Sequence, residues 1–158
     1  MHSQFRSFYT SKLVVLVAGC AAEQVFYGEN TDGASNDMER ATGLMSIMVD
    51  AVAMRPERID LGDRITRQLC AIGEVLLVQG GGQFSSPDKR RFAAEFLGRA
   101  YLTAWTLVVQ NRDGISTIAQ TLVENKELYG DVVFDLLDSV ALKPAELDFL
   151  NIRAWPEM

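Results

Sequence analysis

The spacing of apolar residues along the chain predicts a succession of helices. Apolar side chains recur every three or four positions over residues 38–52, which places them on one face of a helix. Similar patterns predict helices over residues 12–27, 57–79, 87–112, 115–123 and 132–140, and a last short helix beginning at Lys143-Pro144. Residues 76–78 are also compatible with a short strand, although the length of the segment favours a helix. No segment has the pattern of a hairpin, so we expect an all-α fold, a helical bundle.

The boundaries of the first two helices are indicated by particular residues. Gly28 follows the first apolar pattern and is a candidate C-cap, because glycine adopts the left-handed conformation that ends many helices. Residues 28–35 are then a polar loop. Asn36 stands three positions before Glu39, which is the spacing of a capping arrangement. We therefore expect the second helix to begin at Asn36.

Breaks further along the chain divide its second half. Arg55-Pro56 predicts an end or a bend, since the residue before proline avoids the helical region. The glycines at 80–82 lack the Lys-Ser/Thr of a phosphate-binding loop, and we expect a flexible connector near residues 80–85. Ser86-Pro87-Asp88 has the cap, the first-turn proline and the first-turn acid of a helix start. Asp113-Gly114 is the next expected break.

Length and charge narrow the class of protein. The 158 residues suggest one domain, residues 1–158, with an ordinary composition of 48% apolar and 23% charged residues. The net charge of -6 argues against nucleic acid as a partner. The basic cluster at residues 89–91 is short, and a solvated helix start is the better interpretation of it.

The most apolar run, residues 13–22, is about half as long as the ~20 residues that span a bilayer. We therefore expect a buried helix and no membrane segment in this chain; a signal peptide ending near Cys20 is the alternative. Cys20 and Cys70 have no disulfide or zinc-ribbon spacing, which suggests free thiols in a reducing cytoplasm. The single histidine, His2, lies at the terminus, which argues against a cysteine nucleophile.

The polar stretch at residues 31–42 contains the candidate site residue, Asp37. It lies in the first turn of a predicted helix, where backbone N–H groups favour an anion. From spacing alone, the better interpretation is that Asp37 stabilises the helix start. Glu23 and Glu39 could add oxygen ligands, but a site made only of carboxylates suits magnesium or calcium. Glu23 is better explained as a buried acid bonded to the backbone or to a basic neighbour.

Two blocks of this sequence resemble the FtsH family of membrane-bound, ATP-dependent zinc proteases. The first contains Gly19 to Glu23, Tyr27-Gly28, Gly33 to Asp37 and Glu39 to Thr42, with Asp32 where the family has threonine. The second, from Ala100 to Leu137, contains Asn111-Arg112, Ile118-Ala119, Leu122 to Glu124 and Leu128 to Gly130. The first block is fairly specific, and the matching order of the two strengthens both. Residues 55–85 are supported only loosely.

The resemblance implies a role for Asp37, which aligns with the third zinc ligand of the family. The family's other two ligands come from a His-Glu-x-x-His helix whose glutamate is the general base, and this sequence contains no such motif. The family's ATPase module is absent as well. We therefore expect an N-terminally incomplete peptidase-type domain, the C-terminal helical part, with no catalytic residues and no zinc bound by this chain alone.

Two functions follow from these observations. The first is a part or relative of an FtsH-like zinc metallopeptidase, inactive as this isolated chain. The second is a non-catalytic assembly or adaptor module derived from that domain. The resemblance further implies a homo-oligomer, a hexameric ring in the family, or an ATPase or protease partner. It also implies a location in the cytoplasm, in the family at the cytoplasmic face of the inner membrane.

Overall fold

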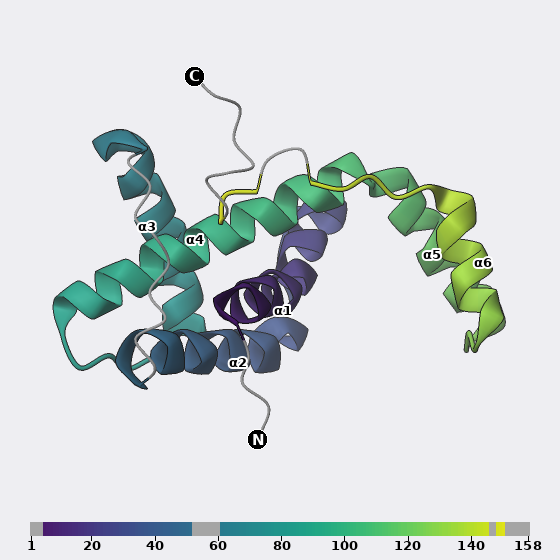
Figure 1. Ribbon diagram of the computed structural model, residues 1–158. Helices are drawn as coiled ribbons and strands as arrows, with labels where there is room; N and C mark the ends of the chain where they lie inside the picture. The colour runs from purple at the N-terminus through teal and green to yellow at the C-terminus, as the bar shows by residue number, and fades with distance from the viewer. Residues whose placement is uncertain (1–4, 52–60, 146–147, 151–158) are drawn as a thin grey trace.

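All regular secondary structure in the described part of the chain is helical. The computed structural model describes residues 5–51, 61–145 and 148–150 (Figure 1). Its elements are α1 (Arg6–Tyr27), the 3-10 turn η1 (Asp32–Ala34), α2 (Ser35–Ser46), the π-helical turn η2 (Ile47–Ala51), α3 (Gly62–Gln79), α4 (Pro87–Gln110), α5 (Arg112–Asn125) and α6 (Asp131–Val140). The all-α prediction is confirmed. Residues 76–78 lie inside α3, so the strand alternative is wrong.

The long helix α4 organises the body of the molecule, which consists of α1 to α4. Helices α1 and α3 pack on α4, and α2 packs on both α1 and α3 (Figure 1). Between them lies one apolar cluster, whose side chains of 0% exposure include Leu13, Val17, Met45, Leu77 and Leu97. The run at residues 13–22 contributes the inner face of α1 to this cluster. No helix among the described residues is long and apolar enough to cross a membrane.

Two glycines allow α3 and α4 to pack unusually close together. A Cβ added at Gly73 would lie 1.7 Å from the backbone oxygen of Ala94, and one added at Gly98 would lie 2.1 Å from that of Leu69. Backbone atoms cannot move aside as a flexible side chain can. The two helices therefore meet through backbone contacts that any other residue at these positions would push apart.

Several predicted helix ends are confirmed. Gly28 ends α1 with φ 77°, and its N–H donates to the carbonyl oxygen of Gln24. Ser86 caps α4, with its side chain accepting from the N–H of Lys89, and Pro87 is the first helical residue. The start of α1 differs, because the helix begins at Arg6 rather than at residue 12.

Three predicted boundaries are wrong. Helix α2 begins at Ser35 without a side-chain cap, which places Asn36 inside the helix. Helix α4 ends at Gln110 and α5 begins at Arg112, so residues 113–114 lie in the first turn of α5 instead of forming the break. The described residues after Lys143-Pro144 form no helix. The predictions for His2 and for Arg55-Pro56 concern residues outside the described ranges.

The segment after α6 returns along α4 instead of forming the expected helix (Figure 1). The Asn111 amide donates to the carbonyl oxygen of Lys143 at 3.0 Å and accepts its N–H at 2.6 Å. Arg99 is 2% exposed, lies 5.3 Å from the centre of the Phe96 ring, and donates from Nε to the carbonyl oxygen of Phe149 at 2.6 Å. These contacts satisfy backbone groups that a helix would have satisfied internally.

Two of the three residues in the basic cluster at 89–91 form ion pairs between the start of α4 and other elements of the body. Lys89 pairs with Asp50 of η2, and this contact is the main cause that lowers the pKa of the Asp50 carboxyl. Arg90 pairs with Glu74 of α3 at 2.7 Å. The cluster is thus more than a solvated helix start, because it joins the beginning of α4 to α3 and η2.

Candidate functional site

The turn between α1 and α2 is organised around the carboxylate of Glu23. Thr31 donates to it twice, from its backbone N–H to Oε2 at 2.9 Å and from its hydroxyl to Oε1 at 2.7 Å. These hydrogen bonds, that of the Thr31 hydroxyl first, hold the pKa of the Glu23 carboxyl below its usual range. The prediction that Glu23 bonds to the backbone is confirmed, although the residue is half-buried rather than buried.

Two further hydrogen bonds, made by Asn30 and Thr31, also hold the turn between α1 and α2 in place. The Asn30 amide donates to the carbonyl oxygen of Cys20 at 2.7 Å, near the C-terminal end of α1. The Thr31 hydroxyl also accepts the N–H of Gly33 at 3.2 Å, which starts η1. Because η1 leads directly into α2, these bonds set where α2 begins and which way its first turn faces.

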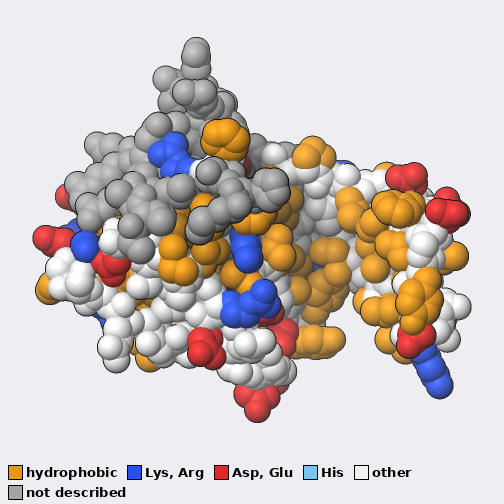
Figure 2. Space-filling model, turned by 60° about the horizontal axis from the view of Figure 1, so that its bottom comes forward, with side chains coloured by type: hydrophobic (Ala, Val, Ile, Leu, Met, Phe, Trp, Pro, Cys, Tyr) orange, Lys and Arg blue, Asp and Glu red, His pale blue; other side chains and the backbone are white. Residues whose placement is uncertain are grey.

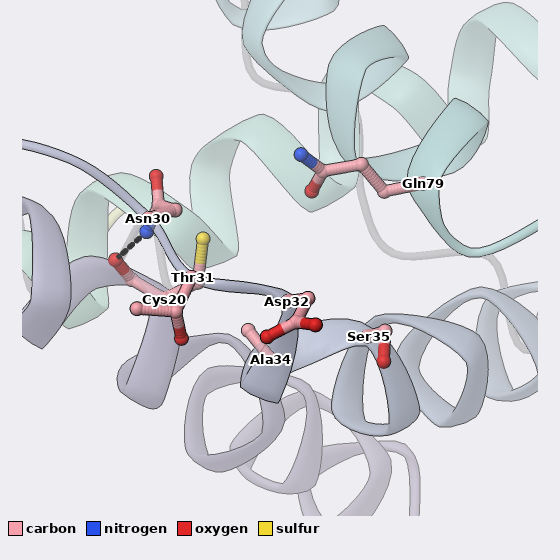
Figure 3. A pocket seen from close by; sticks show the side chains of 7 residues that line it. All are labelled: Cys20, Asn30, Thr31, Asp32, Ala34, Ser35 and Gln79. Carbon is pink, nitrogen blue, oxygen red and sulfur yellow. Dashed lines mark hydrogen bonds between the residues drawn. The ribbon is translucent and has the colours of Figure 1, made fainter.

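A pocket of about 180 Å³ lies beside this turn (Figure 3). Cys20, Asn30 and Thr31 line one side of it, Asp32, Ala34 and Ser35 line the base, and Gln79 at the end of α3 faces them across the opening (Figure 3). Burial raises the pKa of the Cys20 thiol, so this sulfur is a neutral, weakly nucleophilic group. The pocket therefore offers hydrogen-bonding groups and no activated nucleophile among its lining residues.

The first turn of α2 also borders a wider, neighbouring hollow that shares Ser35 and Gln79 with the pocket. Ser35, Asn36 and Glu39 of α2 line this hollow of about 410 Å³ together with Gln79, Gly80 and Gly81. The connector glycines are packed against α2, since a Cβ added at Gly80 would lie 2.1 Å from the Thr42 hydroxyl oxygen. Whether the connector near residues 80–85 is flexible stays a prediction, but its first glycines are in close contact with α2.

Asp37 occupies the third position of α2 and is partly exposed. Its carboxylate lies 3.6 Å from the Arg40 guanidinium, one turn further along the same helix, and 46% of its side-chain surface remains accessible. An exposed pair of this kind contributes little to stability. Asp37 is thus accessible to a ligand or to a neighbouring segment.

The described residues alone do not fit a zinc centre. A protein zinc site of the catalytic type needs three protein ligands at about 2 Å and one open position. No group of three histidine, cysteine, aspartate or glutamate side chains within the described ranges is arranged to hold a metal ion. Near Asp37, Glu23 is instead bonded to Thr31. Asp32, Asp37 and Glu39 remain accessible here, but they do not form a three-ligand group within the described residues.

A model of peptidase family M41 matches residues 2–136. The chain therefore belongs to peptidase family M41, and the resemblance to FtsH proteases is confirmed.

Individual relatives agree with this assignment. The chain is 31% identical over 150 residues to the ATP-dependent zinc metalloprotease FtsH of Akkermansia muciniphila, covering 90% of this chain and 18% of that protein. It is 32% identical over 139 residues to FtsH of Pseudomonas putida, covering 85% and 22%. It is 30% identical over 147 residues to FtsH 1 of Thermomicrobium roseum, covering 88% and 22%. The chain thus spans about a fifth of the length of these relatives. No solved structure matches it.

Sequence reasoning identified Asp37 but not the contacts that surround it. The bonds between Glu23 and Thr31 join residues eight positions apart across the Gly28 cap, and helical periodicity carries no signal for such a contact. The packing of Gly80 on Thr42 was missed for a similar reason, since a run of glycines indicates flexibility as readily as close approach.

Proposed function

We propose that this chain is the helical part of an FtsH-type peptidase domain and that Asp37 is its contribution to a zinc site. The observation that carries the proposal is the position of Asp37. It is accessible in the first turn of α2, directly after the α1–α2 turn that hydrogen bonds of Glu23, Asn30 and Thr31 hold in place. The fold of the α1–α2 turn thus supports a preformed place for one ligand.

The chemistry of such a site needs groups from outside the described residues. Two histidines four positions apart on a helix place both imidazoles on one face, and the glutamate between them acts as general base. A zinc ion held by such a set would supply the Lewis acid that activates water towards a peptide carbonyl. In this chain Asp37 would complete the ligand set, while Arg40 would have to release or share its carboxylate. The chain by itself is therefore proposed to be inactive in peptide hydrolysis.

A chimera tests this proposal directly. The His-Glu-x-x-His segment of the Pseudomonas putida relative would be joined to the N-terminus of this chain, and zinc binding would be measured by competition with a chelator. We expect the chimera to bind one zinc ion, the chain alone to bind none tightly, and Asp37→Asn to weaken binding by about tenfold or more. Glu39→Gln is the matched control, because Glu39 lies in the same turn of α2 and should leave the affinity unchanged.

Two results would contradict the proposal. Equal zinc affinity in the Asp37→Asn and Glu39→Gln chimeras would show that Asp37 is not a ligand. Tight stoichiometric zinc binding by the unmodified chain would place the metal at other residues.

The second candidate function is a non-catalytic assembly or adaptor module. The apolar surface of α5 and α6 favours it, because no described residue of these two helices is buried. By analogy with the family, we propose a homo-oligomer, a hexameric ring or contact with an ATPase or protease partner, at the cytoplasmic face of the inner membrane. A folded chimera that fails to bind zinc but still self-associates would favour this function over the first.

A further inference from the structure

Helices α5 and α6 form an arm that extends away from the body and carries an apolar surface (Figures 1 and 2). Five large apolar side chains of the two helices are exposed, Leu122 45%, Val123 78%, Val132 56%, Phe134 66% and Leu137 39%, and Tyr129 in the loop between the helices is 70% exposed. Helices of 14 and 10 residues are marginal in isolation. An arm with so much exposed apolar surface is expected to gain most of its stability from a surface that covers it.

Acidic residues lie beside this apolar surface on α6. Asp131, Asp135 and Asp138 are three or four positions apart and therefore share one face of the helix. Phe134 and Leu137 lie on the adjoining flank, and α6 carries no basic residue. The exposed side of α6 thus combines apolar and acidic character, and it runs for about 15 Å along ten residues.

The outer face of α1 has the matching character. Phe5, just before α1, is 83% exposed, Phe8 is 46% exposed and Val15 is 71% exposed, and Lys12 is exposed between the last two. Their spacing places these side chains in one stripe, which we call the α1 stripe. It is again about 15 Å long. No acidic residue occurs in α1 before Glu23.

We propose that the arm of one copy of this chain docks on the α1 stripe of a second copy. The proposal rests on the proposed homo-oligomer and names its interface. Apolar surface is covered on both sides, while Asp135 and Asp138 approach Lys12. Pairing of two arms with each other would instead bring two acidic faces together, and like charges across an interface are unfavourable. The charges therefore favour docking of the arm on the α1 stripe over pairing of two arms.

This contact is heterologous, because each copy offers an arm to one neighbour and a stripe to another. Contacts of this type close into rings when the rotation between copies permits, and otherwise extend into filaments. The arm need not change its fold to dock, since its apolar flank is already exposed in the single chain. Self-association should therefore occur in the chain as it is, without metal or nucleotide.

Charge exchange tests the pairing. Sedimentation velocity of the full 158-residue chain over a range of concentrations should show reversible association. Asp135→Lys with Asp138→Lys should raise the dissociation constant by about tenfold or more, and so should Ser11→Glu with Lys12→Glu. All four substitutions together should restore association, because the opposite charges are again paired. Asp63→Lys with Glu39→Lys changes the net charge as much as the arm pair does, away from both surfaces, and should have little effect.

Each alternative has its own result. A chain that stays monomeric at the highest soluble concentration overturns the proposal. Association that survives the α1 substitutions but not the arm substitutions shows that the arm docks on another surface and overturns the choice of α1. Loss of association in both pairs without recovery in the fourfold variant also contradicts it, provided circular dichroism shows that each variant folds. None of these results depends on zinc, so they separate the failure of this interface from the failure of the role proposed for Asp37.

Discussion

The body and the arm of this molecule are built from similar sequence patterns but differ in how their apolar residues are used. In the body, α1 to α4 bury one continuous cluster, and α4 alone has ten buried residues. In the arm, α5 and α6 have an equally clear helical pattern, yet no described residue in either is buried. The difference shows that amphipathic periodicity predicts a helix but does not predict whether the apolar face of that helix is buried within the same chain.

The close contact between α3 and α4 should make the body the least tolerant region. Gly73→Ala would place a methyl group 1.7 Å from the Ala94 backbone oxygen. We expect a loss of about 3 kcal/mol or more in the free energy of unfolding, because a backbone must move. In the arm, the Cβ of Gly114→Ala would lie closest to the flexible Leu142 side chain, at 3.0 Å, and in ordinary contact with Val140 at 3.4 Å or more, so stability should change by less than about 1 kcal/mol. Urea denaturation measures both, and equal effects would contradict the contrast.

Truncating a leucine to alanine should also lower the stability of the body more than that of the arm. Leu97 of α4 has 0% exposure, so Leu97→Ala should cost about 2–5 kcal/mol through lost burial and the cavity left behind. Leu137 of α6 is 39% exposed, and Leu137→Ala should cost less than about 1 kcal/mol in the monomer. Thermal unfolding in dilute solution provides the comparison. A larger loss for Leu137→Ala would mean that the arm packs more tightly than its exposure indicates.

In the body, removal of the buried Thr42 hydroxyl should not lower the stability of the fold. Thr42 is 2% exposed, and within the described ranges its hydroxyl has no hydrogen-bond partner. Thr42→Val keeps the shape and removes the unpaired hydroxyl, so we expect stability to stay equal or rise by about 1 kcal/mol. Thr42→Ala leaves a small cavity and serves as the control. Destabilisation by valine as large as that by alanine would show that the hydroxyl is bonded in solution.

The smallest expected effect concerns pH at the α1–α2 turn. The folded-state pKa of Glu23 lies below its usual value of 4.5, mainly through the Thr31 hydroxyl. A depressed carboxyl pKa stabilises the fold above the unfolded pKa, and this contribution is lost as the pH falls below about 4.5 and through the folded pKa. Thr31→Val should move the pKa of Glu23 upward. Carbon-13 NMR titration measures it, and an unchanged pKa would show that the Thr31 hydroxyl does not bind Glu23.

The helices themselves follow from the sequence more completely than their ends do. Gly28 and Ser86 were correct boundaries because each has a local, self-contained mechanism, a left-handed residue in one case and a side-chain cap in the other. Asn36 failed because η1 continues directly into α2, so the first turn of α2 is set by Thr31 and Glu23. The predicted helix after Lys143 failed because Asn111 and Arg99 bind backbone carbonyl oxygens of that segment, those of Lys143 and Phe149.

The candidate site was predictable to a similar degree. The family motif indicated Asp37, and its place in the first turn of α2 agrees with the sequence. The neighbouring pocket could not be predicted, because it depends on Gln79 of α3 lying opposite Cys20 and Asp32. These residues are far apart in the sequence and come together only in the folded chain. A single sequence records local periodicity and caps far better than the packing of one helix end against another.

Hydrogen–deuterium exchange followed by mass spectrometry tests the contrast between body and arm most directly. The backbone amides of α4 and those of α5 and α6 would be compared in a dilute and in a concentrated sample. We expect α4 to be strongly protected at both concentrations, because its hydrogen bonds open only when the body unfolds. The arm should be weakly protected in the dilute sample and gain protection on concentration, as a second copy covers it. Arm amides as strongly protected as those of α4 in the dilute monomer would contradict the account.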